Sequence, residues 1–255
     1  MADILLYDDP HTRLRTPHLL SALKRDLKKS GIVFNASDRT SFTNAIQDNP
    51  AVIFIAENIG AKCHHMRDIS PETIRAMKQY VQNGGTIVLF GGAAHYAMSD
   101  ITWHWDNGTK IYKGPKETFS FVNGQMIGPH HRHPISLSDP VKYNGCFEVP
   151  ILSHAKDGTI SLEKCWQGNC GNFVVNEDRV QHGFEILATY AHAQKRHGVA
   201  AISVPLGKHG GSFILCSVMP HYNARGHSPL WDNILSRVEQ KISGKMAQPS
   251  LKRHL

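Results

Sequence analysis

The segment from Gly84 to Tyr96 has the form of a site that holds a nucleophile, but no nucleophile is present. It reads GGTIVLFGGAAHY: two glycines that end a helix, an apolar strand over 86–90, and a Gly-rich turn into a second helix. In α/β proteins such an elbow lifts one side chain above the carboxyl edge of the sheet, where cysteine or serine reaches substrate and backbone N–H groups. The tip here is Gly91-Gly92-Ala93. The sequence therefore predicts an enzyme-like scaffold without the elbow chemistry, which favours recognition over catalysis.

Two histidines are the remaining candidates for chemistry near this elbow. His95-Tyr96 follows the elbow directly, and His221 follows a late apolar strand. A converging pair could act as an acid–base pair or bind a small anion. The favoured interpretation is a hydrogen-bonded remnant that fills the space of the absent nucleophile. Cys216, three residues before Met219 in the late strand, is interpreted as a small buried apolar residue.

Two His-rich tracts carry metal-binding residue types without metal-binding spacing. Cys63-His64-His65-Met66 follows the third predicted strand, and His130-His131-Arg132-His133 is bounded by a proline. Adjacent side chains rarely point at one ion, so loops at the rim of a site are favoured over metal centres. Cys165 and Cys170 flank a turn, and a disulfide between them is disfavoured. We predict no metal and no cofactor.

Trp103-His104-Trp105 lies in a polar stretch of the sequence. Two tryptophan side chains in such a stretch must be buried against another surface. As i and i+2 residues of an extended chain they share a face, and exposed tryptophan is unusual unless a partner contacts it. A lid or partner contact and packing of this segment on its own domain both remain open. In the first case these three residues are the predicted partner-binding site.

Composition describes an ordinary globular protein with a basic balance. The chain has 255 residues, 41% of them hydrophobic, and a net charge of +7. The basic residues are dispersed and no nucleic-acid module is present, so a solvated basic face is favoured over nucleic-acid binding. No apolar run is long enough to span a bilayer, and the opening MADILLYDDP predicts a first strand and not a signal peptide. Five cysteines without framework spacing indicate reduced thiols and a cytoplasmic location.

Strands and helices alternate over the first hundred residues. Strands are predicted at 3–7, 32–34, 52–56 and 86–90, and helices at 17–30, 41–47 and from 71, where Ser70 provides a cap and Pro71 the first helical position. The helix over 17–30 has Thr16 as its predicted N-cap and ends at Gly31. This alternation predicts an α/β fold with a doubly wound, mostly parallel sheet.

The second half is richer in strands. We predict them at 142–149, 159–163, 172–175, 185–190, 199–204 and 212–218, with a hairpin turn over 205–211, then a helix over 229–242. Residues 1–243 are predicted to form a single domain with an insertion at about 99–143. Residues 244–255 are predicted to be a disordered basic tail.

Four segments together resemble one family, the N-terminal class I glutamine-amidotransferase-like domain of biotin protein ligases (holocarboxylase synthetases). In chain order they are DILLY, GGTIVLFGGAAHY, VKYNGCFEV and VAAISVPLGKHGGSFILCSVMPH. The resemblance runs from Asp3 to about Ile242, and LGKHGGSFILC is its most specific part. It implies a flavodoxin-like sheet, places Tyr143-Asn144-Gly145 just before a strand, and implies that the late hairpin returns the chain to the site.

The chain departs from active members of the amidotransferase class at their catalytic positions. Those enzymes place cysteine at the elbow and His-x-Glu at a late strand end. Gly91 stands at the elbow, and the late strand aligns Met219-Pro220-His221 with His-x-Glu. A shift of two aligns His221 with the histidine but Asn223 with the carboxylate. At least two of three roles are unfilled either way. The remnant pocket implied by the resemblance comprises Gly91, Gly92, His95, Tyr96, Tyr143, Asn144, Met219 and His221.

The resemblance implies an accessory module and no ligase activity, because the Gly-Arg-Gly-Arg-like loop that wraps biotinyl-adenylate in biotin ligases is missing. We expect a non-catalytic domain whose partner is a biotin ligase catalytic domain or a biotin acceptor protein, with no nucleic acid and no membrane. The alternative is a hydrolase or small-ligand-binding protein that uses the pocket around His95 and His221. A metal-binding protein built on the His tracts is a third possibility.

Overall fold

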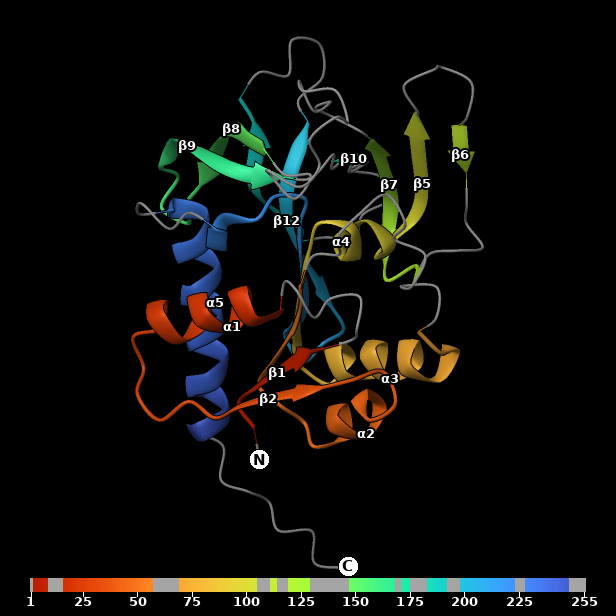
Figure 1. Ribbon diagram of the computed structural model, residues 1–255, viewed down its shortest axis with the longest axis vertical. Coiled ribbons are helices and arrows are strands. Elements are labelled where there is room, and N and C mark those ends of the chain that lie inside the picture. Colours follow the sequence, from red (N-terminus) through yellow and green to blue (C-terminus); the bar gives the residue numbers. More distant parts are fainter. Residues whose placement is uncertain are drawn as a thin grey trace, which may run out of the picture.

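The computed structural model describes residues 2–8, 16–56, 69–104, 111–113, 119–128, 147–167, 171–174, 183–191, 198–222 and 228–247. Strands and helices alternate in the first half (Figure 1): β1 (Ile4–Tyr7), α1 (Thr16–Asp26), β2 (Phe34–Ser37), α2 (Phe42–Gln47), β3 (Val52–Ile55), α3 (Pro71–Gln82), β4 (Thr86–Phe90) and α4 (Gly92–Tyr96).

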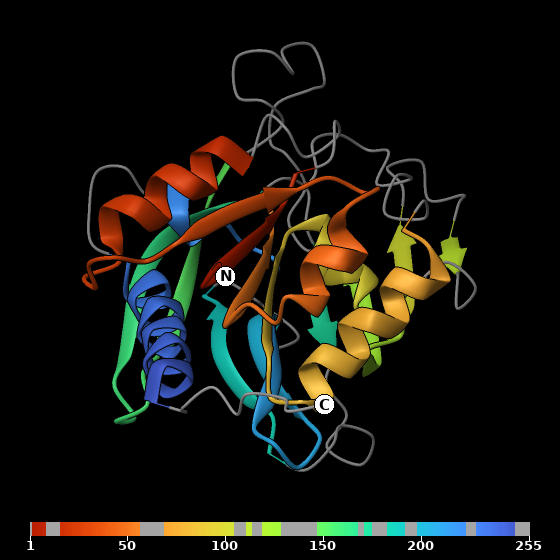
Figure 2. The ribbon, with the colours of Figure 1, turned by 90° about the horizontal axis from the view of Figure 1, so that it is seen from below.

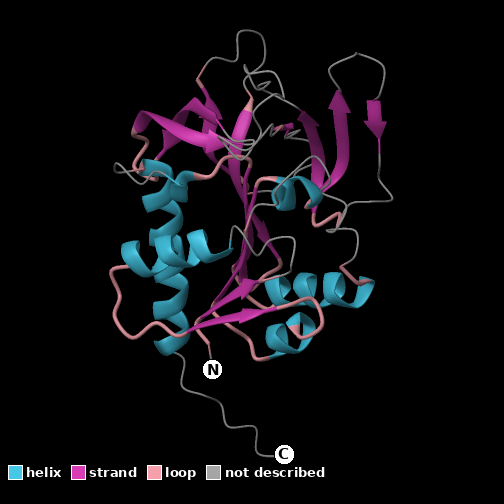
Figure 3. Ribbon diagram, in the orientation of Figure 1, coloured by secondary structure: helices cyan, strands magenta, loops and turns pink. Residues whose placement is uncertain are grey.

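The second half is built mainly from strands and closes on one long helix. Its elements are β5 (Met98–His104), β6 (Ile111–Lys113), β7 (Val122–Gly128), β8 (Phe147–His154), β9 (Ile160–Gln167), β10 (Asn172–Val174), β11 (Glu185–Tyr190), β12 (Val199–Leu206), β13 (Gly211–Cys216), the 3₁₀ helix η3 (Pro220–Tyr222) and α5 (Pro229–Ala247). The predicted α/β class with a strand-rich second half is confirmed, as Figure 3 shows.

All described strands join one sheet, in the order β2-β1-β3-β4-β13-β12-β10-β7-β5-β6, with β11, β8 and β9 branching from β12. The five strands from β2 to β13 are mutually parallel, whereas β12 and the branch pair antiparallel. Parallel strands place their carboxyl ends at one edge, so the segments that follow β1, β3, β4 and β13 meet there.

Helices cover both faces of the parallel part (Figure 2), and each face has its own core. Side chains of α2, α3 and α4 pack with one set of strand residues, including Leu89 and Phe213. Side chains of α1 and α5 pack with the alternate set, including Phe90 and Ile214. This alternation is the period of two that a strand buried on both faces requires.

Local signals explain the helices that the sequence predicted. The Ser70 side chain accepts a hydrogen bond from the backbone N–H of Thr73 at 3.1 Å, and Pro71 occupies the first turn of α3. This is the cap that the sequence predicts, because a β-region serine satisfies one of the unpaired N–H groups of the first turn.

Two predicted boundaries in the first half are wrong. The helix over 17–30 ends earlier, at Asp26, and Thr16 is already its first residue. The strand placed at 32–34 is formed instead by Phe34–Ser37, whose two central residues are exposed. β2 is an edge strand that pairs only with β1 among the described strands, so it does not need the apolar run on which the prediction relied.

The predicted insertion over 99–143 supplies strands to the sheet. β5 and β7 pair in parallel, and β7 joins the sheet through β10. These strands are not recognisable in the sequence because polar residues occupy their cross-strand positions. The Gln125 amide donates to Asp100 at 3.0 Å and to Thr102 at 2.9 Å. The pattern that predicts strands depends on apolar alternation, which these residues lack.

The last helix, α5, extends to Ala247, five residues beyond its predicted end. Residues 244–247 are therefore helical and not part of a disordered tail, and the Lys245 ammonium anchors this last turn by donating to the backbone oxygen of Asn49. Residues 248–255 of the predicted tail lie outside the described residues.

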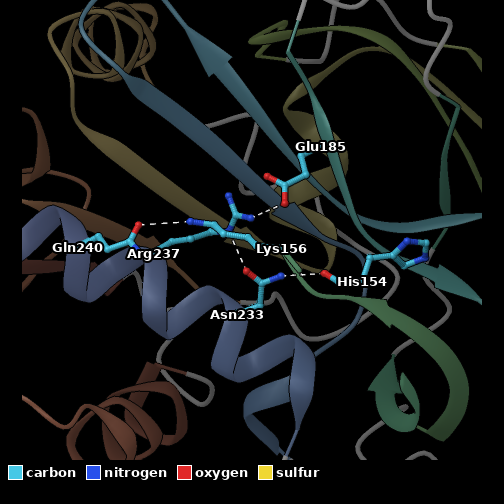
Figure 4. Close-up of polar contacts among 6 residues, drawn as sticks. All are labelled: His154, Lys156, Glu185, Asn233, Arg237 and Gln240. Carbon is cyan, nitrogen blue, oxygen red and sulfur yellow. Dashed lines mark hydrogen bonds and ion pairs between the residues drawn. The ribbon is translucent and has the colours of Figure 1, made fainter. Parts of the chain in front are cut away.

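Polar side chains fix α5 to the antiparallel branch (Figure 4). Arg237 bonds Glu185 of β11 at 2.6 Å and donates to Asn233 at 2.9 Å. Asn233 in turn donates to the backbone oxygen of His154 at 2.9 Å, at the end of β8. Lys156, in the turn between β8 and β9, donates to Gln240 at 3.3 Å. The contacts of His154 and Lys156 thus attach the β8–β9 hairpin to the helix.

Candidate functional site

The predicted elbow forms where the sequence places it, directly after β4. Gly91 has φ 53° and ψ −126°, and its N–H donates to the backbone oxygen of Cys216 at 2.7 Å. This hydrogen bond joins the ends of the parallel neighbours β4 and β13. A positive φ is easily reached by glycine and strained for other residues. The backbone has the geometry of an elbow, and the residue at its tip carries no side chain.

His95, four residues later, is directed into the protein by α4. The imidazole is 5% exposed, and its Nε2 lies 3.0 Å from the Ser217 hydroxyl. Ser217 Oγ donates to the backbone oxygen of Gly171 at 2.6 Å, and the Tyr190 hydroxyl donates to the same oxygen at 3.2 Å. Gly171 directly precedes β10, and Ser217 directly follows β13, which ends beside the elbow. The hydrogen bonds of Ser217 therefore attach the start of β10 to the elbow.

The Ser217 hydroxyl is committed to the protein backbone. A serine has one proton to donate, and the 2.6 Å bond assigns it to the backbone oxygen of Gly171. His95 Nε2 lies 3.0 Å from this hydroxyl and accepts a longer hydrogen bond, at 3.4 Å, from the backbone N–H of Gly171. Because the serine proton is bonded to a carbonyl oxygen, Ser217 and His95 do not have the arrangement of a nucleophile beside its base.

Burial lowers the pKa of His95 to about 3, so the ring is neutral in the folded protein at physiological pH. An unfolded histidine titrates near 6.5. The unfolded chain therefore binds one more proton than the folded chain between pH 6.5 and pH 3, and stability contributed by neutral His95 is lost as the pH falls through this window.

We expect His95→Gln to flatten the pH dependence of the free energy of unfolding below pH 6.5. One proton corresponds to about 1.4 kcal/mol per pH unit, and the slope should fall by up to that amount. Urea unfolding at a series of pH values measures it. His209→Gln, which changes an exposed imidazole, is the control with which the slope of His95→Gln is compared. Equal slopes for the wild type and His95→Gln would contradict the assignment.

His221 lies in a different environment from His95. It is 4% exposed in η3, and its ring centroid lies 4.7 Å from that of Phe90 and 5.6 Å from that of Trp231. These rings belong to the core on the α1/α5 face. The His95 ring instead contacts Phe173, at 6.3 Å, in the core of the other face. The structure therefore places the two imidazoles on opposite sides of the sheet.

The other predicted pocket residues divide into two groups. Gly92 and Tyr96 are buried in α4, and Met219 is buried after β13, where its N–H donates to the backbone oxygen of Trp166 at 2.7 Å. Tyr143 and Asn144 lie outside the described residues.

The predicted partner and metal tracts are mostly outside the described residues as well. Trp105, the tract at 63–66 and the tract at 130–133 all lie there. Trp103 and His104 are on β5, where their backbones pair with Tyr112 and Ile111 of β6. In the part of the chain that the structure describes, no group of three metal-ligating side chains comes together. No described helix combines the length and apolar character needed to cross a bilayer.

The described cysteines do not replace the missing nucleophile. Cys216 is fully buried, and burial together with the nearby Glu163 carboxylate raises the pKa of its thiol. Burial and Glu163 raise the pKa of Cys165 in the same way. A nucleophilic cysteine needs a low pKa and exposure. The prediction that Cys216 is a buried apolar residue is confirmed.

Sequence reasoning missed the residues that hold the elbow, namely Gly171, Tyr190 and Ser217. Their contacts link positions from 19 to 122 residues apart, so no local pattern contains them. One signal was present: Ser217 directly follows a strand that ends beside the elbow, where side chains of parallel sheets gather.

The α/β fold is amidotransferase-like, as comparison with solved structures shows. A crystal structure of a glutamine amidotransferase is similar at TM-score 0.56 and 10% identity, over 94% of this chain and 100% of that chain. A putative ThuA-like protein from Bacteroides uniformis gives TM-score 0.55 and 11% identity, over 94% and 91%. A β-galactosidase from Rahnella sp. R3 gives 0.53 and 10%, over 98% of this chain and 32% of that chain. At such identities the likeness shows the fold alone.

The family is shown by sequence. The family described as biotin-protein ligase, N terminal, matches residues 2–250. The chain belongs to this family, as the resemblance of its segments predicts. No curated protein sequence matches the chain.

Proposed function

We propose that the chain is a non-catalytic, amidotransferase-like accessory domain that supports protein biotinylation. It acts as the corresponding domain of holocarboxylase-synthetase-type ligases would, by recognising either the ligase catalytic domain or the biotin acceptor protein. Membership of the biotin-protein ligase N-terminal family connects the chain to this process.

The non-catalytic part of the proposal rests on one observation: the residues at the elbow form hydrogen bonds within the protein itself. Gly91 occupies its tip, and the neutral His95 is bonded to Ser217, which is bonded to Gly171. Acyl transfer from glutamine requires a nucleophile activated by a base. At this elbow the nucleophile position has no side chain, and the imidazole holds a strand of the protein itself.

A binding titration tests the recognition part. We expect saturable binding of the full chain to a biotin ligase catalytic domain or to its acceptor domain, measured by calorimetry. The segment around Trp103 and Trp105 is the first proposed contact, so Trp103→Ala/Trp105→Ala should weaken binding about tenfold or more if these residues are central to the interface. Absence of binding to both partners, with folding intact by circular dichroism, would refute the proposal.

A further inference from the structure

The carboxyl end of β1 lies where the order of the strands reverses. From β1 the chain passes through α1 to β2 on one side of β1, and then through α2 to β3 on its other side. The two helices cover opposite faces of the sheet, as Figure 2 shows. Ligands of doubly wound folds bind outside the carboxyl ends of the strands at such a switch point. This position is two strands away from the elbow, which follows β4.

Asp8 is the first residue after β1 and stands at this switch point. Its backbone N–H donates to the oxygen of Ser37 at 2.8 Å, which extends the pairing of β1 with β2. The residue as a whole is half-buried, and its Oδ1 atom is fully buried. Among the residues that the structure describes, none provides a hydrogen bond to this oxygen. A buried carboxylate oxygen is costly unless a donor or a cation compensates for its lost hydration.

The hydroxyl groups next to the end of β1 already have contacts within the chain. Thr16, the first residue of α1, donates its hydroxyl to the backbone oxygen of Tyr7 at 3.2 Å. The Ser37 hydroxyl, at the end of β2, lies 2.7 Å from the hydroxyl of Ser41. If one of these groups turned to donate to Asp8, an existing hydrogen bond would be lost. A cation from solution can satisfy the carboxylate without that loss.

The ligand atoms at this position are oxygens. Besides the carboxylate of Asp8 they include the backbone oxygens of Tyr7 and Ser37, each of which accepts one hydrogen bond and retains a second lone pair. Oxygen ligands suit Mg²⁺ and Ca²⁺, whereas nitrogen and sulfur ligands suit transition metals. Mg²⁺ retains several water molecules and needs only one or two carboxylates from a protein. Such a site does not require three ligating side chains, and the described residues contain no group of that kind.

We propose that the carboxyl end of β1 binds a divalent cation, Mg²⁺ or Ca²⁺, with Asp8 as its anionic ligand and water molecules in most of the other positions. The sequence alone predicts no metal, because its His-rich tracts lack metal-binding spacing. The strand order is what brings Asp8 to the switch point. This cation site goes beyond the proposed accessory function, and its test needs no partner protein.

Amide chemical shifts of the full chain, titrated with MgCl₂ and with CaCl₂ at constant ionic strength, test this. We expect saturable shifts at the amides of Asp8 and Ser37 with one of the two salts, with a Kd on the order of 1 mM because a single carboxylate provides the charge. Asp8→Asn keeps the size of the side chain and removes its charge, and it should weaken binding about tenfold or more. Asp157→Asn is the matched control, since Asp157 is an exposed carboxylate in the β8–β9 turn, and it should leave the titration unchanged.

The outcomes distinguish a cation site from a carboxylate that is only hydrated. Saturable shifts centred on Asp8, lost in Asp8→Asn, support the proposal. Shifts that spread over exposed carboxylates without saturation and persist in Asp8→Asn overturn it, because they show only non-specific ion binding. No shift at the end of β1 also overturns it, since water or another residue of the chain then satisfies Asp8.

A second variant covers the case in which Asp8→Asn does not fold by circular dichroism. Asp8→Glu keeps the charge and displaces it by one methylene, so it should weaken the binding of the cation by a measurable factor. Unchanged binding in Asp8→Glu together with unchanged shifts at the end of β1 would refute the assignment of Asp8. None of these results bears on biotin-ligase recognition, which the binding titration with the partner proteins tests separately.

Discussion

Gly211→Ala is expected to destabilise the protein by about 3 kcal/mol, which lowers the melting temperature by about 6–12 °C for a chain of this size. Gly211 begins β13 and lies against the carboxyl end of α3. A methyl group there would overlap the backbone oxygen of Val81 and lie 2.8 Å from that of Gly85. Both neighbours are backbone atoms, so no side-chain rotation relieves the clash.

The β12–β13 turn next to Gly211 shows why the destabilisation by Gly211→Ala should extend beyond this residue. The N–H of Ser212 donates to the Gly85 oxygen at 3.1 Å, and Gly207, at φ 76°, leaves only 3.0 Å between its Cβ position and the oxygen of Gln82. The β12–β13 turn and the end of α3 therefore approach each other backbone to backbone. Moving Gly211 would also shift β13, whose register with β4 places Cys216 beside Phe90 at the elbow.

Gly244→Ala is the matched control. Gly244 lies in α5 with no atom within 4 Å of its Cβ position, so alanine should stabilise the helix by about 0.5–1 kcal/mol. Thermal and urea unfolding of both variants measure the difference. Similar stabilities for Gly211→Ala and the wild type would show that the close approach relaxes at little cost.

This approach also explains the most specific part of the family resemblance. The stretch LGKHGGSFILC contains the glycines that the close approach requires, at the opposite end of β13 from the elbow. It returns the chain to the site only because β13 then runs to Gly91, as its hydrogen bond to Cys216 shows. Backbone packing thus accounts for the glycines of the motif.

The sequence predicted elements whose signals are local. Ser70 and Pro71 identify the start of α3, and the apolar run over 86–90 with its glycines identifies β4 and the elbow. It did not predict β5 and β7, because their stabilising pairs are polar: Gln125 bonds Asp100 and Thr102 across the sheet. It placed β2 on apolar residues, although an edge strand is defined by its neighbour.

The sequence predicted the backbone of the candidate site but did not predict its side-chain contacts. The elbow and its empty tip follow from residue types at 86–93, since a strand followed by glycines has few alternatives. The use of His95 does not, because its partners come from the distant positions 171 and 217. The placement of His221 on the other face of the sheet depends on the turn after β13. Neither of the two family alignments of the late strand predicts the direction of this turn.

Substitution of Glu163 is expected to have the second large effect on stability, because four donors converge on this one buried carboxylate. Oε1 accepts from the Ser153 hydroxyl and, at 2.9 Å, from the N–H of Leu230. Oε2 accepts from the Ser228 hydroxyl at 2.7 Å and lies 3.7 Å from the Cys165 sulfur. Ser228 also accepts from the N–H of Trp231. The carboxylate thus satisfies the first turn of α5 and is favourably placed at the positive end of its dipole.

Glu163→Gln should destabilise the protein by about 2–4 kcal/mol, since the amide nitrogen replaces one acceptor and opposes donors that are buried with it. Glu163→Ala should cost more, because every donor then loses its acceptor. Urea unfolding measures both. Glu239→Gln is the control: this carboxylate on the same helix accepts one N–H, from Lys28 at 2.8 Å near the surface, and its loss should cost under about 1 kcal/mol.

The same substitution tests how the hairpin is held. If Glu163 fixes β9 to α5, then Glu163→Gln should speed hydrogen exchange at the amides of the first turn of α5 and along β9, while α3 on the other face stays protected until global unfolding. Uniformly faster exchange would mean that the carboxylate contributes only to global stability. A loss of protection confined to α5 and β9 would show that the β8–β9 hairpin depends on this one buried carboxylate for its rigidity.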